Sequence, residues 1–406
     1  MSRTRARTWL LRLATVSFAV FVALLIAEAV LRMRMRVDSE PRVAGSFESV
    51  AQFCAPRHHC LVPNGHYDHS SYEYSYSWDN NGLGMRDREH PRTKPPGTFR
   101  ILVLGDSFVQ GHGVRVEDTM VTRLEASLNQ PPRAQTVEVL NGGVFGYSPL
   151  LEYLYLRDTI GELQPDLVVV AVFLGNDVGE DAFYARKAHV SADGESLSFD
   201  DREWPWSKIV AALDGGETPV AAAPAAAPGP GGPWASAKDL LRNLRTVALL
   251  RSRLEDVRYP ARRAREFALV KAHRGDVEFD LGLINYPALS RDQRLAYWQP
   301  TKQNLERIAT LCREHGARMV LLVIPPFERL TGETELDEPY AIVDQLGRDL
   351  AVPVIQLLPD FLGQPPDALY YRFDRHWTAE GNRRAAQVVD QELRRLDVLP
   401  EGGAAH

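Results

Sequence analysis

The sequence feature that most constrains the fold is the run Leu167–Phe173, an uncharged and largely β-branched segment. A strand of this composition is buried on both faces, as in a parallel sheet covered by helices. Segments with helical periodicity alternate with similar short apolar segments before and after it. The chain is therefore expected to form an α/β domain with a parallel sheet and helices on both faces. The expected strands are 100–105, 136–140, 167–173, 318–324 and 352–357, and the expected helices are 117–128, 150–163, 302–315, 339–350 and 378–396.

The alternation is interrupted after its third strand and resumes near residue 300. We therefore expect one α/β domain made of residues 99–182 and 300–398, with residues 183–299 as an insertion. The middle of this insertion, 215–233, is rich in Ala, Pro and Gly, a composition typical of a disordered linker. Residues 238–274 are basic with helical spacing, which fits either a solvated helical face or a contact with a membrane surface.

Residues 37–98 precede this alternation and are expected to be a connecting region with short strands. Within it, aromatic and polar residues alternate with a period of two, which predicts a strand that includes Tyr72, Tyr74, Tyr76 and Trp78. The following Asn80-Asn81-Gly82 segment is typical of a turn.

Cysteine is scarce, with three residues in the chain, so a disulfide-rich scaffold is excluded. Cys54 and Cys60 are close enough in sequence to form a disulfide, which an exported domain can retain. The alternative is a Cys/His metal site with His58 or His59, but no second cluster at metal-ligand spacing accompanies it. Cys312 lies in a helical pattern and is expected to be a buried, free thiol.

The charge of the chain is unevenly distributed. Residues 1–36 hold seven Arg and one Glu, whereas the whole chain has a net charge of −6, so the remainder is strongly acidic. An acidic main body argues against nucleic acid as the partner. Residues 13–31 form a mostly apolar run between two Arg clusters, long enough to cross a bilayer.

The apolar run has three interpretations. We favour a retained transmembrane anchor with a cytoplasmic N-terminus, which would make the protein a single-pass protein of the inner, or cytoplasmic, membrane. The domain after residue 35 would then be periplasmic or extracellular. A cleaved signal peptide is the main alternative, because Ala27-Glu28-Ala29 has the small-x-small form of a cleavage site. A buried core helix is the third, and the flanking Arg clusters argue against it.

Polar motifs follow three of the expected strands, at the sheet edge where ligands bind in open α/β folds. Gly105-Asp106-Ser107 follows the first, and a serine at such a turn is either a helix cap or an exposed nucleophile. The glycine-rich segment Asn141–Gly146 follows the second, and Gly175-Asn176-Asp177 follows the third. The Asn176 amide and the backbone N–H groups of Ser107 and Gly146 are candidate donors to an oxyanion.

A nucleophilic serine needs a base, and the base needs a group that orients it. His376 and Asp374 lie after the fifth strand, again at the carboxyl edge, and residues two apart project to the same side of an extended segment. Asp374 can therefore bond one ring nitrogen while the other faces Ser107. His112 is the alternative base but has no acid in register, and a loop ion pair without function is the alternative for Asp374 and His376.

These ordered motifs resemble those of the SGNH-hydrolase (GDSL lipase/esterase-like) superfamily over residues 99–182 and 305–396, roughly half of the chain. The resemblance places the nucleophile on Ser107, the oxyanion donors on Gly146 and Asn176, and the base on His376. It implies a flavodoxin-like three-layer α/β/α sandwich with a central five-stranded parallel sheet.

One block departs from the commoner family pattern. A D-x-x-H spacing would place the acid at Phe373, whereas this chain has Asp374-Arg375-His376-Trp377. The D-x-H-W spacing is similar to that of alginate acetyltransferase-like members, so the resemblance still assigns the acid to Asp374.

The sequence therefore predicts a membrane-anchored serine esterase that needs no metal and no organic cofactor. The expected substrate is a small ester or an acylated envelope or extracellular carbohydrate, by family analogy, with a possible partner in the envelope-polysaccharide machinery. One alternative is an O-acyltransferase of a cell-envelope polysaccharide that uses the same triad. A second alternative is an inactive glycan-binding scaffold, which predicts a broken triad.

Overall fold

The computed structural model describes residues 3–34, 49–70, 73–131, 135–190, 197–199, 290–332, 337–372 and 374–400. Its centre is a five-stranded sheet in which every neighbouring pair is parallel. The strands are β5 (Thr98–Gly105), β6 (Thr136–Gly143), β7 (Leu167–Phe173), β10 (Arg318–Ile324) and β11 (Val354–Gln356). Their order across the sheet, β6-β5-β7-β10-β11, is the flavodoxin-like order. The predicted α/β class and five-stranded parallel sheet are confirmed.

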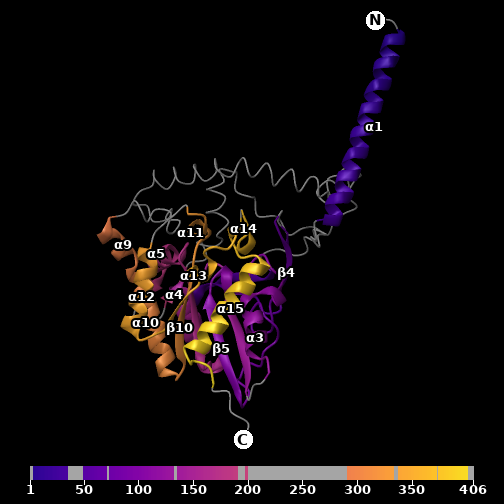
Figure 1. The fold of residues 1–406 in the computed structure, drawn as a ribbon. Coiled ribbons are helices and arrows are strands. Elements are labelled where there is room, and N and C mark those ends of the chain that lie inside the picture. Colours follow the sequence, from indigo (N-terminus) through magenta and orange to yellow (C-terminus); the bar gives the residue numbers. More distant parts are fainter. Residues whose placement is uncertain are drawn as a thin grey trace.

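Helices cover both faces of this sheet (Figure 1). Alternate residues of β5 divide between two cores, with Leu102 and Leu104 in one and Ile101 and Val103 in the other. The first core is closed by α4 (Pro149–Leu163), α10 (Gln299–Glu314) and α12 (Glu338–Leu350). The second is closed by α3 (Met120–Leu128) and α15 (Ala379–Arg395). The chain therefore forms three layers with the sheet in the middle.

Most bounds differ from the expectation by one to three residues, and β4 (Ser75–Asp79) begins after Tyr74, which was expected within the strand. Two of the differences have a clear physical reason. β6 continues through Asn141-Gly142-Gly143, because these residues pair with Val103–Gly105 of β5. The segment expected to be one helix from residue 117 instead begins as the 3-10 helix η3 (Val116–Asp118). The Thr119 side chain then accepts a hydrogen bond from the Thr122 amide and begins α3 as its N-cap.

Residues 49–98 pack into the α/β domain. They form two antiparallel hairpins, β1 (Ala51–Cys54) with β2 (His58–Leu61) and β3 (His66–Ser70) with β4 (Ser75–Asp79), and a 3-10 helix, η2 (Ala55–Arg57), joins the first pair. Tyr74, Tyr76 and Trp78 belong to the same core as α4 and α10. Cys54 and Cys60 form a disulfide across the first hairpin, and Cys312 is a buried free thiol.

The remaining helices lie at or near the sheet's carboxyl edge or at the ends of the insertion. They are α2 (Ser107–Gln110), α5 (Asp177–Lys187), α9 (Arg291–Tyr297), α11 (Phe327–Thr331), α13 (Leu358–Phe361) and α14 (Pro366–Leu369). β8 (His189–Val190) pairs with β9 (Leu197–Ser198) in an antiparallel arrangement. The predicted linker 215–233 and the basic segment 238–274 lie outside the described residues.

The N-terminal helix α1 (Arg3–Arg34) stands apart from the α/β domain (Figure 1). Several of its large apolar side chains, including Val16, Phe18 and Phe21, are more than half exposed. Within the part of the chain that the structure describes, no helix meets the length and hydropathy needed to span a membrane.

Candidate active site

The candidate site lies at the carboxyl edge of the sheet, beside the two neighbouring strands β5 and β7. The connection from β5 leads to β6 on one side, and the connection from β7 leads to β10 on the other, so this is the point where the strand order reverses. Ligands bind at such a switch point because the two connections diverge there. Ser107 follows β5 directly, and Asn176 lies three residues after the end of β7.

Ser107 is the first residue of α2, but it is not the cap of that helix. The N-cap is Asp106, whose Oδ1 accepts a hydrogen bond of 2.9 Å from the Phe108 amide. The Ser107 hydroxyl instead lies 2.7 Å from Nε2 of His376. The capping interpretation of Ser107 is therefore wrong, and its hydroxyl lies within hydrogen-bond reach of a base.

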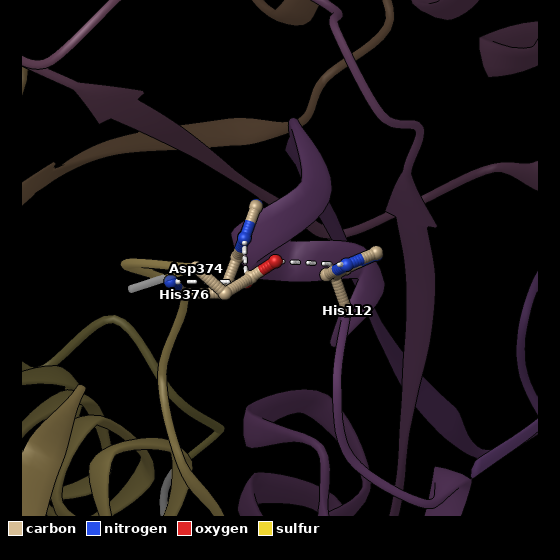
Figure 2. A group of neighbouring side chains, drawn as sticks. All are labelled: His112, Asp374 and His376. Carbon is tan, nitrogen blue, oxygen red and sulfur yellow. Dashed lines mark hydrogen bonds and ion pairs between the residues drawn. The ribbon is translucent and has the colours of Figure 1, made fainter. Parts of the chain in front are cut away.

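His376 is held between Ser107 and Asp374. Its Nδ1 lies 2.6 Å from Oδ1 of Asp374, so the two ring nitrogens face the acid and the serine respectively. Both residues lie on the short segment between α14 and α15, where Arg375 has a φ of 72°. This left-handed residue turns the chain between the acid and the base. Figure 2 shows the two side chains pointing toward each other.

The protonation states favour an ionised acid beside a basic imidazole. Burial works against the charged form of His376, but the charge and hydrogen bond of Asp374 outweigh it and raise the pKa of His376 above its usual 6.5. Burial likewise opposes ionisation of Asp374, yet the charge of His376, its hydrogen bond and the nearby His112 ring hold the pKa of this carboxyl far below its usual range. The ionised Asp374 carboxylate therefore makes the His376 imidazole a better proton acceptor.

Gly146 lies in a turn that two other elements hold in place. Its φ of 64° is in the left-handed region that favours glycine. The Tyr184 hydroxyl of α5 donates to the Gly146 carbonyl at 3.0 Å, and Nε2 of His59 donates to the neighbouring Phe145 carbonyl at 2.6 Å. The metal-site alternative for His59 gains no support, since its two ring nitrogens bond Phe145 and His58.

Asn176 precedes α5, and its amide is oriented by that helix. Its Nδ2 donates to Oε1 of Glu180 at 3.1 Å, which leaves the second N–H of the same amide for another acceptor. Glu180 and Tyr184 are four residues apart and lie on the same face of α5. One helix face therefore orients both Asn176 and the turn that contains Gly146.

Sequence reasoning missed the partners of Asp374 outside the triad. The Tyr74 hydroxyl donates to Oδ2 of Asp374 at 2.6 Å, and Oε2 of Glu73 accepts from the Asp374 amide at 2.8 Å. Nε2 of His112 is 3.7 Å from the same Oδ2. The alternation of aromatic residues that includes Tyr74 was the one available signal in the sequence. Such an alternation predicts a strand, but it does not show which residue of another segment the strand contacts.

His112, Asp374 and His376 are also the residues, among those described, whose ligand atoms lie close enough to hold a metal ion, all within 4.8 Å (Figure 2). The Tyr74 hydroxyl lies between two of them, 2.6 Å from Oδ2 of Asp374 and 2.7 Å from Nε2 of His112. These atoms already satisfy one another, so we assign the group to hydrogen bonding.

Several carboxyl groups are buried beneath the site. Burial raises the pKa of Glu180 to about 8 and that of Asp106 to about 6, and it also raises the pKa values of Glu152, Asp177 and Asp181. Within the described chain, neither carboxyl oxygen of Glu152 has a hydrogen-bond partner. With a pKa of about 8, Glu180 is mostly protonated at neutral pH.

The C-terminal part of the chain matches a known protein family. Residues 289–406 match the family model described as SGNH hydrolase-like domain, acetyltransferase AlgX. The matched residues include the Asp374-Arg375-His376-Trp377 block, and the match confirms the resemblance to the SGNH hydrolase superfamily and its alginate acetyltransferase-like members. No curated protein matches the chain significantly.

Several solved structures are similar over most of the chain. A lipase/acylhydrolase from Enterococcus faecalis is 14% identical, with a TM-score of 0.37 over 76% of this chain and 100% of that one. The esterase EstA from a Pseudoalteromonas species is 10% identical, with a TM-score of 0.36 over 73% and 97%. An acetylxylan esterase from Geobacillus stearothermophilus is 12% identical, with a TM-score of 0.39 over 76% and 97%. At TM-scores below 0.5 these likenesses carry no conclusion about this chain.

The buried state of Glu180 predicts a pH-dependent gain in stability for Glu180→Gln. A carboxyl whose pKa rises on folding, here from 4.5 to about 8, binds its proton more tightly in the folded chain. The Glu180 carboxyl therefore stabilises the folded chain fully at a pH below its pKa in the unfolded chain. This stabilisation is lost as the pH rises through its pKa in the folded chain. Gln keeps an acceptor for Asn176 and does not titrate. The unfolding free energy of the variant relative to wild type should therefore increase by roughly 2 kcal/mol between pH 6 and pH 8.

Urea denaturation at several pH values measures this difference. Glu380→Gln is the matched control, because Glu380 is exposed and its hydrogen bond with Arg383 holds its pKa below the usual value. Its effect should be the same at pH 6 and pH 8. A pH-independent effect of Glu180→Gln would contradict the assignment of a protonated Glu180.

Proposed function

We propose that this chain is a serine enzyme of the SGNH hydrolase superfamily and that it cleaves acyl esters. The observation that carries the proposal is the continuous hydrogen-bonded arrangement of Ser107, His376 and Asp374, with heavy-atom distances of 2.7 and 2.6 Å. A nucleophile bonded to a base, which is in turn bonded to an ionised acid, is the geometry of serine acyl transfer.

In the proposed reaction the Ser107 oxygen attacks the ester carbonyl while Nε2 of His376 takes the hydroxyl proton. Asp374 stabilises the resulting imidazolium, and His376 then gives the proton to the leaving alcohol. A second nucleophile, activated by the same imidazole, releases the acyl group from Ser107. Neutral His376 is needed for the first step, so the raised pKa of this residue places the acid limb of the activity profile above pH 6.5.

The oxyanion of the tetrahedral intermediate would be stabilised by the backbone N–H groups of Ser107 and Gly146 and by the Asn176 amide. Support comes from the way α5 fixes two of these donors, through Glu180 on Asn176 and Tyr184 on the Gly146 carbonyl. Donors that are held before the reaction cost little reorganisation when charge develops, which is why such arrangements accelerate acyl transfer.

The second nucleophile distinguishes two functions. With water the enzyme is an esterase, and with a sugar hydroxyl it is an O-acyltransferase. The description of the matched family model names an acetyltransferase, which favours the second. We propose an acylated envelope or extracellular carbohydrate as the substrate in both cases, and a partner in envelope-polysaccharide assembly for the transferase. The intact triad argues against an inactive glycan-binding scaffold.

We also propose that residues 13–31 of α1 anchor the enzyme in the cytoplasmic membrane, with the α/β domain periplasmic or extracellular. The exposed apolar side chains of α1 support this proposal, because a folded domain rarely leaves such a contiguous apolar surface in water. The Cys54–Cys60 disulfide supports it further, since disulfides persist outside the reducing cytoplasm.

The first prediction concerns Ser107→Ala. Loss of the nucleophile should reduce cleavage of p-nitrophenyl esters by several orders of magnitude. Folding should be intact, because Asp106 and not Ser107 caps α2. A fluorophosphonate probe should label the wild type and leave the variant unlabelled.

A separate measurement on the wild type distinguishes the two functions, because added glycans that raise its turnover would identify a transferase. The outcome for Ser107→Ala decides the nucleophile. Full ester cleavage by a variant with a wild-type circular dichroism spectrum would refute the assignment.

The second prediction concerns Asn176→Ala. If the amide donates to the oxyanion, its loss should lower kcat by about 10²–10³ and scarcely change KM, because the charge that it stabilises exists in the transition state. Asn176→Asp should be worse, since it places a negative charge where another develops. Steady-state kinetics with one activated ester measures both. A kcat for Asn176→Ala above about a third of the wild-type value would make this residue structural.

The third prediction concerns the anchor. A reporter fused after residue 60 should be active as alkaline phosphatase and dark as green fluorescent protein, because the fusion point would lie outside the cytoplasm. The protein should remain in the membrane fraction after a carbonate wash. A mature N-terminus near Val30, identified by mass spectrometry, would instead show a cleaved signal peptide.

A further inference from the structure

The Asp374 carboxylate has a second donor in addition to His376. Oδ1 lies 2.6 Å from Nδ1 of His376, and Oδ2 accepts from the Tyr74 hydroxyl at 2.6 Å. Tyr74 lies just before β4 in the N-terminal part of the chain and is 6% exposed. The two oxygens are thus bonded from opposite parts of the sequence, and rotation of the carboxylate would break both bonds.

The direction of each hydrogen bond follows from the chemistry of the groups. An ionised carboxylate can only accept, so the single hydrogen of the Tyr74 hydroxyl is committed to Asp374. Nε2 of His112 lies 2.7 Å from the Tyr74 oxygen and must therefore be the donor in that pair. Nδ1 of His112, 3.1 Å from the Tyr76 hydroxyl, is then the acceptor of that hydroxyl. His112 is neutral with its proton on Nε2, in keeping with a pKa that burial lowers to about 4.

The loop that carries His112 is itself held rigidly. Arg86, which is 1% exposed, donates from Nη1 to the carbonyls of Gln110 and Gly111 and from Nη2 to that of Val114. Hydrogen bonds from a buried guanidinium to carbonyls are among the stronger ones in proteins. The position of His112 relative to Asp374 is therefore fixed by the fold.

The D-x-H spacing explains why the acid needs this outside support. Asp374 lies on a short segment between α14 and α15, next to a left-handed residue, so no long helix or strand fixes its orientation. Its amide bonds Glu73 and its carboxylate bonds Tyr74, two neighbouring residues before β4. The N-terminal part of the chain thus holds the acid at both its backbone and its side chain.

We propose that Tyr74 and His112 are positioning residues for the triad: Tyr74 fixes and partly neutralises the Asp374 carboxylate, and His112 fixes the Tyr74 hydroxyl. This inference rests on the proposed function. Without the Tyr74 hydrogen bond, more negative charge remains on Asp374 and interacts with His376, which favours the charged imidazolium. The carboxylate also becomes free to turn, so the orientation of His376 is lost in part.

The test is Tyr74→Phe, with Tyr371→Phe as its matched control. The Tyr371 ring packs on Tyr74 with centroids 4.8 Å apart, but its hydroxyl donates to the Gly113 carbonyl and not to Asp374. Both variants lose one phenolic hydroxyl that donates a hydrogen bond. Both variants retain the other titratable groups that face the pair, which are His69, Glu73, Tyr76, Asp106 and His112.

In Tyr74→Phe the acid limb of kcat/KM should move to higher pH by about half a unit. The kcat at the optimum should fall about tenfold with KM nearly unchanged, because orientation is lost and no substrate contact is removed. In Tyr371→Phe the acid limb should stay at its wild-type position. An NMR titration of the His376 ring, assigned by its absence in His376→Gln, should show the same rise in pKa without any substrate.

Substitutions at His112 test the other half of the proposal. His112→Gln retains an N–H that can donate to the Tyr74 oxygen and should keep kcat within about twofold of wild type. His112→Leu cannot donate and should change kcat and the His376 titration in the same direction as Tyr74→Phe. An equal His376 pKa in wild type, Tyr74→Phe and Tyr371→Phe would overturn the positioning role, whether or not the protein cleaves esters. A shifted pKa in a protein that neither cleaves esters nor reacts with a fluorophosphonate would instead overturn the proposed function alone.

Discussion

The constraint on which the rest of the structure depends is the position of β5 between β6 and β7 in a fully parallel sheet. All five strands point the same way, so every loop at their carboxyl ends meets at one edge. The chain leaves β5 toward one side and leaves β7 toward the other. The opening between these connections is where Ser107 and Asn176 lie, and the return of the chain after β11 brings Asp374 and His376 to the same edge.

Burial determines the chemistry of the residues at this edge. A carboxylate or imidazole removed from water keeps its charge only where a partner compensates for the lost hydration. Asp374 has such partners and is ionised, whereas Glu180 has an amide donor as its hydrogen-bond partner and holds its proton. Burial thus gives the two carboxyl groups of this site opposite protonation states. Ionised Asp374 can serve in a triad, and protonated Glu180 can orient the Asn176 amide.

The N-terminal hairpins also hold this arrangement in place. The Cys54–Cys60 hairpin supports the turn of Gly146 through His59 and Phe145, and β4 with the residue before it supplies the aromatic hydroxyls around His112. Segments at the two ends of the domain therefore meet around one carboxylate.

The sequence by itself determined the α/β class, the number of strands and the bounds of β7 and β10, because apolar runs and helical periodicity are local signals. It also identified Ser107, His376 and Asp374 as a candidate triad, since motifs at the carboxyl ends of parallel strands must converge. It failed where contacts join distant segments. The extension of β6 through Gly143 depends on its pairing with β5, and the cap of α2 depends on which of two adjacent side chains turns toward Phe108. Only the tertiary structure decided that Tyr74 bonds Asp374, 300 residues away, because periodicity tells which face of a strand is buried but not what is packed against it.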